Sequence, residues 1–370
     1  MILLKLYAIL LFTMPTSKKI LLRVIHNTLD DEGGADHLDK TEPYCANEGG
    51  RYVMPAIRDK IGHAIEIEEL SPITMTLPED PGDPKAKYLG TIVKAASEGI
   101  NQVYSACQQG HKILSLGGNH VRALDVLGAM RVCHEKGIPF GLIWIDQHLD
   151  FNTPETSPTG NIHGMVSAVL QGRGAKELLD LLGSNSFVQP SNIIYIGVRE
   201  DQIDGHDTKD AEGNSAPGTE ASHFASLLKK GAQCFFADSM RVEGLQPYFV
   251  SDEAKKAVQD LSERIKKAGG KLWCEWDVDV VDSEDMPAAV MKNLPVKIVR
   301  KGTEVEVGGG LSAAQMRDLF NFMEQNCEVD GMGIAEICPD KDIDQKSKRL
   351  VAEGVAKVLG LRGFSISCIR

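Results

Sequence analysis

Three short motifs carry the residue types best suited to chemistry in this sequence, and each follows a short apolar run. They are Asp146-x-His148-x-Asp150, Asp277-x-Asp279 and Gly117-Gly118-Asn119-His120. Alternate side chains of an extended chain point to the same side, so each acidic motif gathers its polar groups on one side. Carboxylates and neutral imidazoles are ligands that suit Mn, Fe, Co or Zn. The motifs therefore predict a metal site.

Each motif alone also has an ordinary interpretation, such as a solvated acidic turn or a capping histidine. Together they supply four carboxylates and two imidazoles, which is a ligand set for two divalent cations. Buried like charges are costly unless a shared cation compensates them. A pair of cations can bridge one water and acidify it, which provides a hydroxide nucleophile near neutral pH.

The elements that position these motifs follow from the hydrophobic pattern. Short β-branched apolar runs predict strands buried on both faces, and helical spacing fills several segments between them. Alternating strands and helices predict a parallel sheet covered by helices, with ligands bound beyond the carboxyl ends of the strands. The expected strands are residues 19–25, 112–116, 140–145, 192–198, 232–237, 271–276 and 331–337, and the expected helices are residues 86–109, 121–136, 251–268 and 312–326.

Composition indicates a globular protein: 42% of the 370 residues are hydrophobic and 25% are charged. The net charge of −12, without a basic block, argues against a nucleic-acid partner or an anionic membrane. The eight cysteines show no C-x-x-C pair, so we expect reduced, mostly core cysteines in a cytoplasmic protein, with neither a disulfide framework nor a zinc ribbon.

We expect one α/β domain over residues 19–370, preceded by an N-terminal extension at residues 1–18. The extension contains an apolar run that is too short to span a bilayer. Met14 is a possible alternative start, and a weak signal-like segment is the other interpretation of this run.

The stretch Asp-Phe-Asn-Thr-Pro-Glu-Thr-Ser-Pro-Thr-Gly-Asn-Ile-His-Gly-Met at residues 150–165, together with the metal motifs, resembles the arginase branch of the ureohydrolases. The resemblance extends over residues 114–339. It implies an arginase-like three-layer sandwich with a mostly parallel sheet, and Mn²⁺-dependent hydrolysis of L-arginine to L-ornithine and urea. It also implies a homo-oligomer, either a trimer or a hexamer.

The resemblance also assigns roles to residues. Two Mn²⁺ ions would be held by His120, Asp146, His148, Asp150, Asp277 and Asp279. Asp150 would take a proton from the bridging hydroxide, His163 would exchange protons with solvent, and Glu336 would pair with the substrate guanidinium. The amino-acid end of the substrate would be held by Asn152, Thr159 and Asn161. Neutral amides and hydroxyls suit a zwitterion, and a carboxylate suits a planar cation.

The chain departs from the family pattern in three places. Asn119 and Val121 replace the usual aspartate and serine around the histidine ligand, so the groups that orient this ligand differ from those of the family. Ungapped counting puts Gln202 where an aspartate for the substrate amino group is expected, with Asp201 or Asp204 as replacements. The third departure is at residues 282–290, which lack the usual Asp-Pro…Pro-Ala-Thr-Gly pattern, and at residues 291–303, which look like an insertion.

Two segments, residues 201–221 and 283–308, are expected to be long irregular loops that shape the site. The departures leave two alternatives open. One is a ureohydrolase for agmatine, guanidinobutyrate or formiminoglutamate, and the other is a catalytically silent relative.

Overall fold

The computed structural model describes residues 21–28, 45–63, 65–183, 187–205, 216–237, 250–291, 293, 296–300, 303–307 and 309–361. The expected N-terminal extension at residues 1–18 lies outside this part of the chain. Nine strands form one parallel sheet in the order β2-β1-β4-β11-β8-β5-β6-β7, with β3 beside β1. The strands are β1 (Leu21–Thr28), β2 (Glu66–Glu69), β3 (Ile73–Thr74), β4 (Lys112–Leu116), β5 (Phe140–Ile145), β6 (Ile193–Ile196), β7 (Gln233–Phe235), β8 (Lys271–Asp277) and β11 (Gly331–Ala335).

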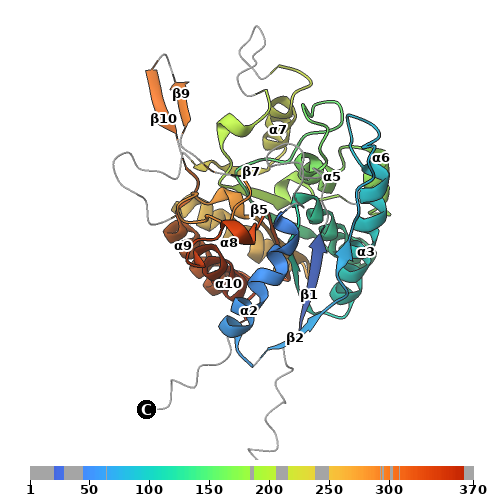
Figure 1. The fold of residues 1–370 in the computed structure, drawn as a ribbon, viewed down its shortest axis with the longest axis vertical. Helices are drawn as coiled ribbons and strands as arrows, with labels where there is room; N and C mark the ends of the chain where they lie inside the picture. The colour runs from blue at the N-terminus through green and yellow to red at the C-terminus, as the bar shows by residue number, and fades with distance from the viewer. Residues whose placement is uncertain are drawn as a thin grey trace, which may run out of the picture.

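Helices cover both faces of this sheet, as Figure 1 shows. The described helices are α2 (Gly49–Ile61), α3 (Leu89–Gln108), α4 (Val126–Lys136), α5 (Val166–Leu170), α6 (Lys176–Asp180), α7 (Glu220–Lys229), α8 (Asp252–Lys267), α9 (Ala313–Asn326) and α10 (Lys346–Val358). Helices α2, α8, α9 and α10 pack on one face, and α3 to α7 pack on the other.

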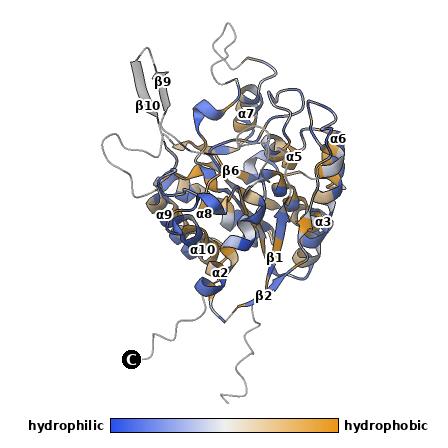
Figure 2. Ribbon diagram, in the orientation of Figure 1, coloured by the Kyte–Doolittle hydropathy of each residue, from blue (hydrophilic) through white to orange (hydrophobic). Residues whose placement is uncertain are grey.

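The central strand β5 shows why two apolar layers form. Ile143 and Ile145 belong to the apolar cluster on one face, whereas Leu142 and Trp144 belong to the cluster on the other. A strand that is apolar at every position must be covered on both sides. The helices accordingly turn apolar residues toward the sheet and hydrophilic residues outward (Figure 2). The predicted three-layer α/β sandwich is therefore confirmed.

Local sequence signals account for several helix boundaries. Helix α9 begins after Ser312, whose hydroxyl accepts the N–H of Gln315 at 3.2 Å while Gln315 accepts the N–H of Ser312 at 2.9 Å. This reciprocal pair is a capping box, and it agrees with the start of the helix expected over residues 312–326. The helix expected over residues 121–136 instead opens as a 3₁₀ turn, His120–Asp125, before α4.

The prediction of an irregular loop over residues 283–308 is wrong in part. An antiparallel hairpin, β9 (Val296–Arg300) and β10 (Thr303–Val307), lies within it and projects from the body of the molecule (Figure 1). The alternation of Val296, Ile298 and Val305 with charged residues is typical of strands. The acidic and glycine-rich flanks favoured a loop instead, which is why the hairpin was not predicted. In the other expected loop, residues 206–215 lie outside the described part, and α7 begins at Glu220.

The expectation for the cysteines is correct for five residues and wrong for one. Cys107, Cys133 and Cys274 are free and buried, and Cys234 and Cys327 are free and half-buried. Cys338 is disulfide-bonded. Because a disulfide depends on which residues the fold brings together, scattered spacing in the sequence could not exclude one. In the described part of the chain, no helix combines the length and apolarity needed to cross a bilayer.

Candidate metal and substrate site

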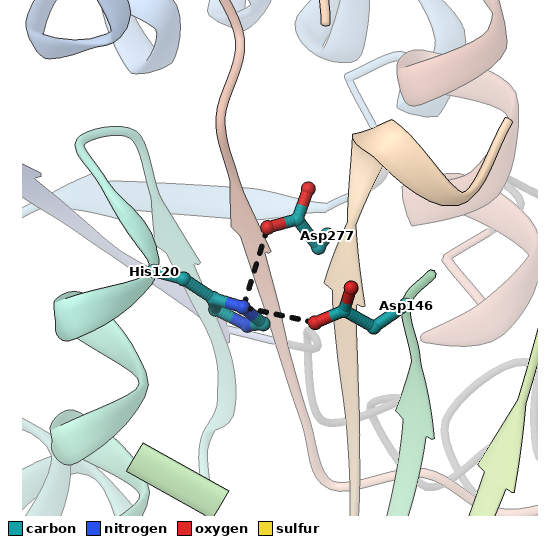
Figure 3. A group of neighbouring side chains, drawn as sticks. All are labelled: His120, Asp146 and Asp277. Atoms are coloured by element: carbon teal, nitrogen blue, oxygen red, sulfur yellow. Dashed lines mark ion pairs between the residues drawn. The ribbon is translucent and has the colours of Figure 1, made fainter. Parts of the chain in front are cut away.

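Three parallel strands deliver acidic groups and a histidine to one edge of the sheet. Asp146 follows β5, Asp277 ends β8, and His120 opens the 3₁₀ turn after β4. The Nδ1 atom of His120 lies 3.1 Å from Asp146 Oδ2 and 3.2 Å from Asp277 Oδ2 (Figure 3). These three buried side chains form one group with the geometry to hold a cation.

A second such group shares Asp146 with the first. His148 Nδ1 lies 3.2 Å from Asp279 Oδ2 and 3.5 Å from Asp146 Oδ1. Asp146 thus presents one carboxylate oxygen to each group. Asp150 Oδ2 lies 2.8 Å from His120 Nδ1, so it adjoins the first group. All six side chains predicted as ligands therefore come together.

Several atoms here are buried without a hydrogen-bond partner in the described part of the chain. They are His120 Nδ1, Asp146 Oδ2, Asp150 Oδ2 and Asp279 Oδ1. Buried polar atoms are normally paired, because an unpaired one loses its hydration with no compensation. Divalent cations coordinated by oxygen and nitrogen would satisfy them, so this donor set fits a metal centre.

The pKa shifts within the cluster also support a metal centre. Burial raises the pKa of Asp277 well above its usual range, and the charges of Asp279 and Asp146 raise it further. Burial opposes a charge on His120, but the adjacent carboxylates of Asp146 and Asp150 outweigh it and raise the His120 pKa well above the ordinary value. As protein groups alone, these side chains hold protons that a metal ion would displace.

Two residues of the site adopt backbone conformations that are uncommon for their type. Asp150 has φ of 49° and Glu336 has φ of 66°, both in the left-handed region. Hydrogen bonds hold Glu336 there: its N–H donates to Gly118 O at 3.0 Å, its carbonyl accepts the N–H of Val290 at 3.1 Å, and its carboxylate accepts the N–H of His120 at 3.0 Å. Such strain concentrates at functional sites.

A cavity of about 240 Å³ lies over the cluster. Its walls include five of the residues predicted to act on the substrate, namely Asn152, Thr159, His163, Asp204 and Glu336, as well as Gln202. Asn152 Nδ2 donates to Asp204 Oδ2 at 2.7 Å, which links two of these residues across the cavity wall.

Two other predicted substrate residues lie elsewhere. Asp201 is not part of the cavity wall, and its carboxylate forms an ion pair with Arg199 at 2.8 Å. Asn161 is buried behind the wall, and its N–H donates to Thr159 Oγ1 at 3.2 Å.

One cavity residue, Glu220, was not predicted from the sequence. Glu220 is 2% exposed, lines the cavity and accepts the N–H groups of Phe151 at 2.8 Å and Asp204 at 3.0 Å. Burial raises the pKa of Glu220 to about 8 against the effect of these two donors. Glu220 is the first residue of α7 and follows a polar stretch of sequence without a motif, so no motif spacing marked it.

The chain matches known proteins over most of its length. A sequence profile of the arginase family matches residues 55–360. An arginase from Staphylococcus aureus is 27% identical over 247 residues, a match that spans 65% of this chain and 65% of the relative's own length.

Solved structures of the same fold agree. A crystal structure of arginase from Bacillus subtilis superimposes with a TM-score of 0.66 at 21% identity, covering 93% of this chain and 99% of that one. A formiminoglutamase variant from Trypanosoma cruzi, solved with Mn²⁺, gives a TM-score of 0.55 at 17% identity, covering 95% and 96%. From the profile match over most of its residues, the chain belongs to the arginase family.

Proposed function

We propose that this protein binds two Mn²⁺ ions and hydrolyses the guanidinium group of L-arginine to L-ornithine and urea. The observation that carries the proposal is one cavity lined both by metal-ligand candidates and by groups suited to an amino acid. Relatives named arginase and the Mn²⁺ in the formiminoglutamase structure support the choice of reaction and metal. The proposed activity therefore places this chain among hydrolases of linear amidine C–N bonds.

The ions would be held by His120, Asp146 and Asp277 on one side and by Asp146, His148 and Asp279 on the other, with Asp150 beside the first group. Two bound divalent cations lower the pKa of a water and so supply a hydroxide nucleophile near neutral pH. The remaining chemistry belongs to the chain's own side chains.

Glu336 presents its carboxylate to the cavity and would pair with the planar guanidinium of the substrate. Asn152, Thr159 and Asp204 would hold the amino-acid end, with Asp204 supplying negative charge for the α-ammonium group. Binding at both ends places the guanidinium carbon over the metal cluster, which converts the attack into a well-oriented reaction.

Proton transfer would be carried by two residues. Asp150 lies against the metal cluster and would accept a proton from the attacking water and deliver it to the leaving amine of ornithine. His163 lines the cavity and is half-buried, so it can reach both the substrate and solvent and would exchange protons between them.

A second candidate function is hydrolysis of another guanidino or formimino compound. It is favoured by Gln202, Val290 and Met291, which line the cavity and belong to the segments where the sequence departs from the family pattern. A catalytically silent protein is disfavoured by the assembly of all six ligand candidates around buried, otherwise unpaired atoms.

Replacing Asp150 tests the proposed chemistry. We expect Asp150→Asn to fold normally and to lose about 10²- to 10⁴-fold in the rate of urea release, the range for a positioned acid–base group. Asp201→Asn is the matched control, because Asp201 lies outside the cavity wall, and it should keep near-normal activity. Near-normal urea release by Asp150→Asn would remove Asp150 from the mechanism.

The trimeric or hexameric assembly and the cytoplasmic location remain predictions from the sequence. Light scattering of purified protein measures the first. Free-thiol counting before and after reduction tests whether the Cys338 disulfide forms in protein made in the cytoplasm.

A further inference from the structure

The His120 ring has two ends, and only one faces the metal cluster. Its Nδ1 atom lies 2.8 Å from Asp150, 3.1 Å from Asp146 and 3.2 Å from Asp277. Its Nε2 atom points the other way and lies 3.5 Å from Glu275 Oε1. The ring also stacks on Trp144, with 4.6 Å between centroids.

Glu275 is an unusual residue for its position. It lies in β8 two residues before Asp277, on the same side of the strand, and both its side chain and that of Arg122 are fully buried. Trp273 Nε1 donates to Glu275 Oε2 at 3.0 Å, which fixes the carboxylate from the side away from His120.

Arg122 supplies the charge that balances Glu275. Its guanidinium contacts Glu275 Oε1 as an ion pair, and in the described part of the chain its nitrogens have no hydrogen-bond partner. Arg122 lies two residues after His120 in the same 3₁₀ turn. The histidine, the carboxylate and the guanidinium therefore form a short buried row behind the metal cluster.

Gly333 leaves room for the Arg122–Glu275 pair. A Cβ atom on Gly333 of β11 would lie 2.2 Å from Glu275 Oε2 and 2.3 Å from the Arg122 guanidinium. Glycine at 333 is thus what allows the two charged groups to meet beneath the sheet edge. A buried ion pair is weak evidence for stability, since desolvation offsets its attraction, so a role beyond packing is the better explanation.

We propose that the Arg122–Glu275 pair is a positioning device for His120. Glu275 accepts the Nε2–H of the neutral ring, which leaves the Nδ1 lone pair directed at the cation, and Arg122 holds Glu275 in place. A neutral imidazole has one donor and one acceptor nitrogen, so the partner of one nitrogen determines what the other can do. This inference rests on the proposed function only in requiring that His120 bind a metal ion.

The opposing interpretation is that the pair only fills space in the core. The two interpretations differ for a double variant, Arg122→Leu with Glu275→Leu, which removes both charges without leaving either one unpaired. A space-filling pair can be replaced by apolar side chains with little effect on the rest of the molecule. A positioning pair cannot, because the leucine side chain that replaces the carboxylate would offer the His120 ring no acceptor.

The experiment is calorimetric titration of the metal-stripped full chain with Mn²⁺, with bound metal counted after dialysis. In the double variant we expect cooperative unfolding and one Mn²⁺ site of wild-type affinity. We expect the other site to be weakened about 10- to 100-fold, as for loss of a residue that orients a metal ligand. Glu275→Gln keeps the side-chain size but has one acceptor oxygen for the two N–H groups of Trp273 and His120, so it should weaken the same site, and it serves if the double variant does not fold.

Cys274→Ala is the matched control. Cys274 is the neighbouring residue of β8, buried on the opposite face of the sheet, so its removal perturbs the same strand without touching His120. It should bind both ions normally. Wild-type affinity at both sites in the double variant, or in Glu275→Gln, overturns the positioning role. Failure of the wild-type chain itself to bind Mn²⁺ would instead overturn the proposed metal site, and the inference with it.

Discussion

Asn152 and Asp204 are joined by a hydrogen bond of 2.7 Å from the side-chain amide to the carboxylate, across 52 residues of sequence. The orientation of the Asn152 amide is fixed, because its oxygen accepts the Thr156 hydroxyl at 2.8 Å. The pair presents an oriented carboxylate to the cavity. It is a suitable contact for the α-ammonium group of an amino acid.

Asp204→Asn should therefore impair the use of L-arginine. Loss of a charge-assisted hydrogen bond costs about 1.5 to 3 kcal/mol, so kcat/KM for arginine should fall by about 10- to 100-fold. Guanidinobutyrate has no α-amino group, and its kcat/KM should change little. An equal loss of kcat/KM for both compounds would show that Asp204 does not bind the α-ammonium group.

Asn119 should control the protonation of His163. Its side-chain oxygen accepts the N–H of Val121 at 2.9 Å, so its NH₂ group is the part that faces His163 Nδ1 at 3.2 Å. An NH₂ donor there favours the neutral ring. In Asn119→Asp a carboxylate would favour the protonated ring.

We expect the acid limb of the pH–rate profile of Asn119→Asp to move up by about one pH unit. Asn119→Ser removes the amide without adding charge and is the control, and Mn²⁺ content should be measured for both variants. An acid limb that stays in place in Asn119→Asp would rule out this coupling.

Glu220 should make stability depend on pH. Burial raises its pKa to about 8 in the folded chain from 4.5 in the unfolded one. The folded state then binds more protons between these values. This contribution to stability is full below the unfolded pKa and is lost as the pH rises through about 8.

Glu220→Gln cannot titrate, so it should lack this loss. Relative to the variant, the wild-type free energy of unfolding should fall by about 3 kcal/mol from pH 6 to pH 9, measured by urea denaturation with Mn²⁺ present. Parallel curves for the two proteins would contradict the raised pKa. At low pH the variant should be less stable than wild type, because its amide opposes one of two backbone N–H donors, and this deficit should shrink as the pH rises.

Metal binding should release protons. The pKa of Asp277 is raised by burial and by Asp279, and His120 and His148 are held protonated by their carboxylate neighbours despite burial. Mn²⁺ must displace these protons, so its affinity should rise with pH by about tenfold per unit for each proton released.

Calorimetry in two buffers of different ionisation enthalpy counts the released protons. We expect at least one per chain near neutral pH, and chelation should lower the melting temperature because it leaves the carboxylates uncompensated. Metal uptake without proton release would contradict the electrostatic description of the site.

The metal cluster was predictable because its signals are local. Asp146, His148 and Asp277 follow apolar strands at alternate positions, and parallel strands bring their carboxyl ends to one edge. Strands β4, β5 and β8 have nearly the expected bounds for the same reason. Position relative to a strand end was thus enough to assemble the six ligand candidates.

The remaining features depend on tertiary contacts. Glu220 reaches the cavity only because α7 packs beneath Asp204, and Cys338 pairs only because the fold supplies a partner. Ungapped counting favoured Gln202 over Asp204, although both line the cavity, because residues in loops do not keep a fixed spacing. Glu275 did leave a signal, as a charged residue inside an apolar strand.

The most direct test of the proposed function is product release by the Mn²⁺-loaded protein. L-arginine, agmatine and guanidinobutyrate would be assayed for urea, and formiminoglutamate for formamide, at matched concentrations. We predict that L-arginine is the preferred substrate. Preference for another compound, or no product from protein shown to hold two Mn²⁺ per chain, would contradict the proposal.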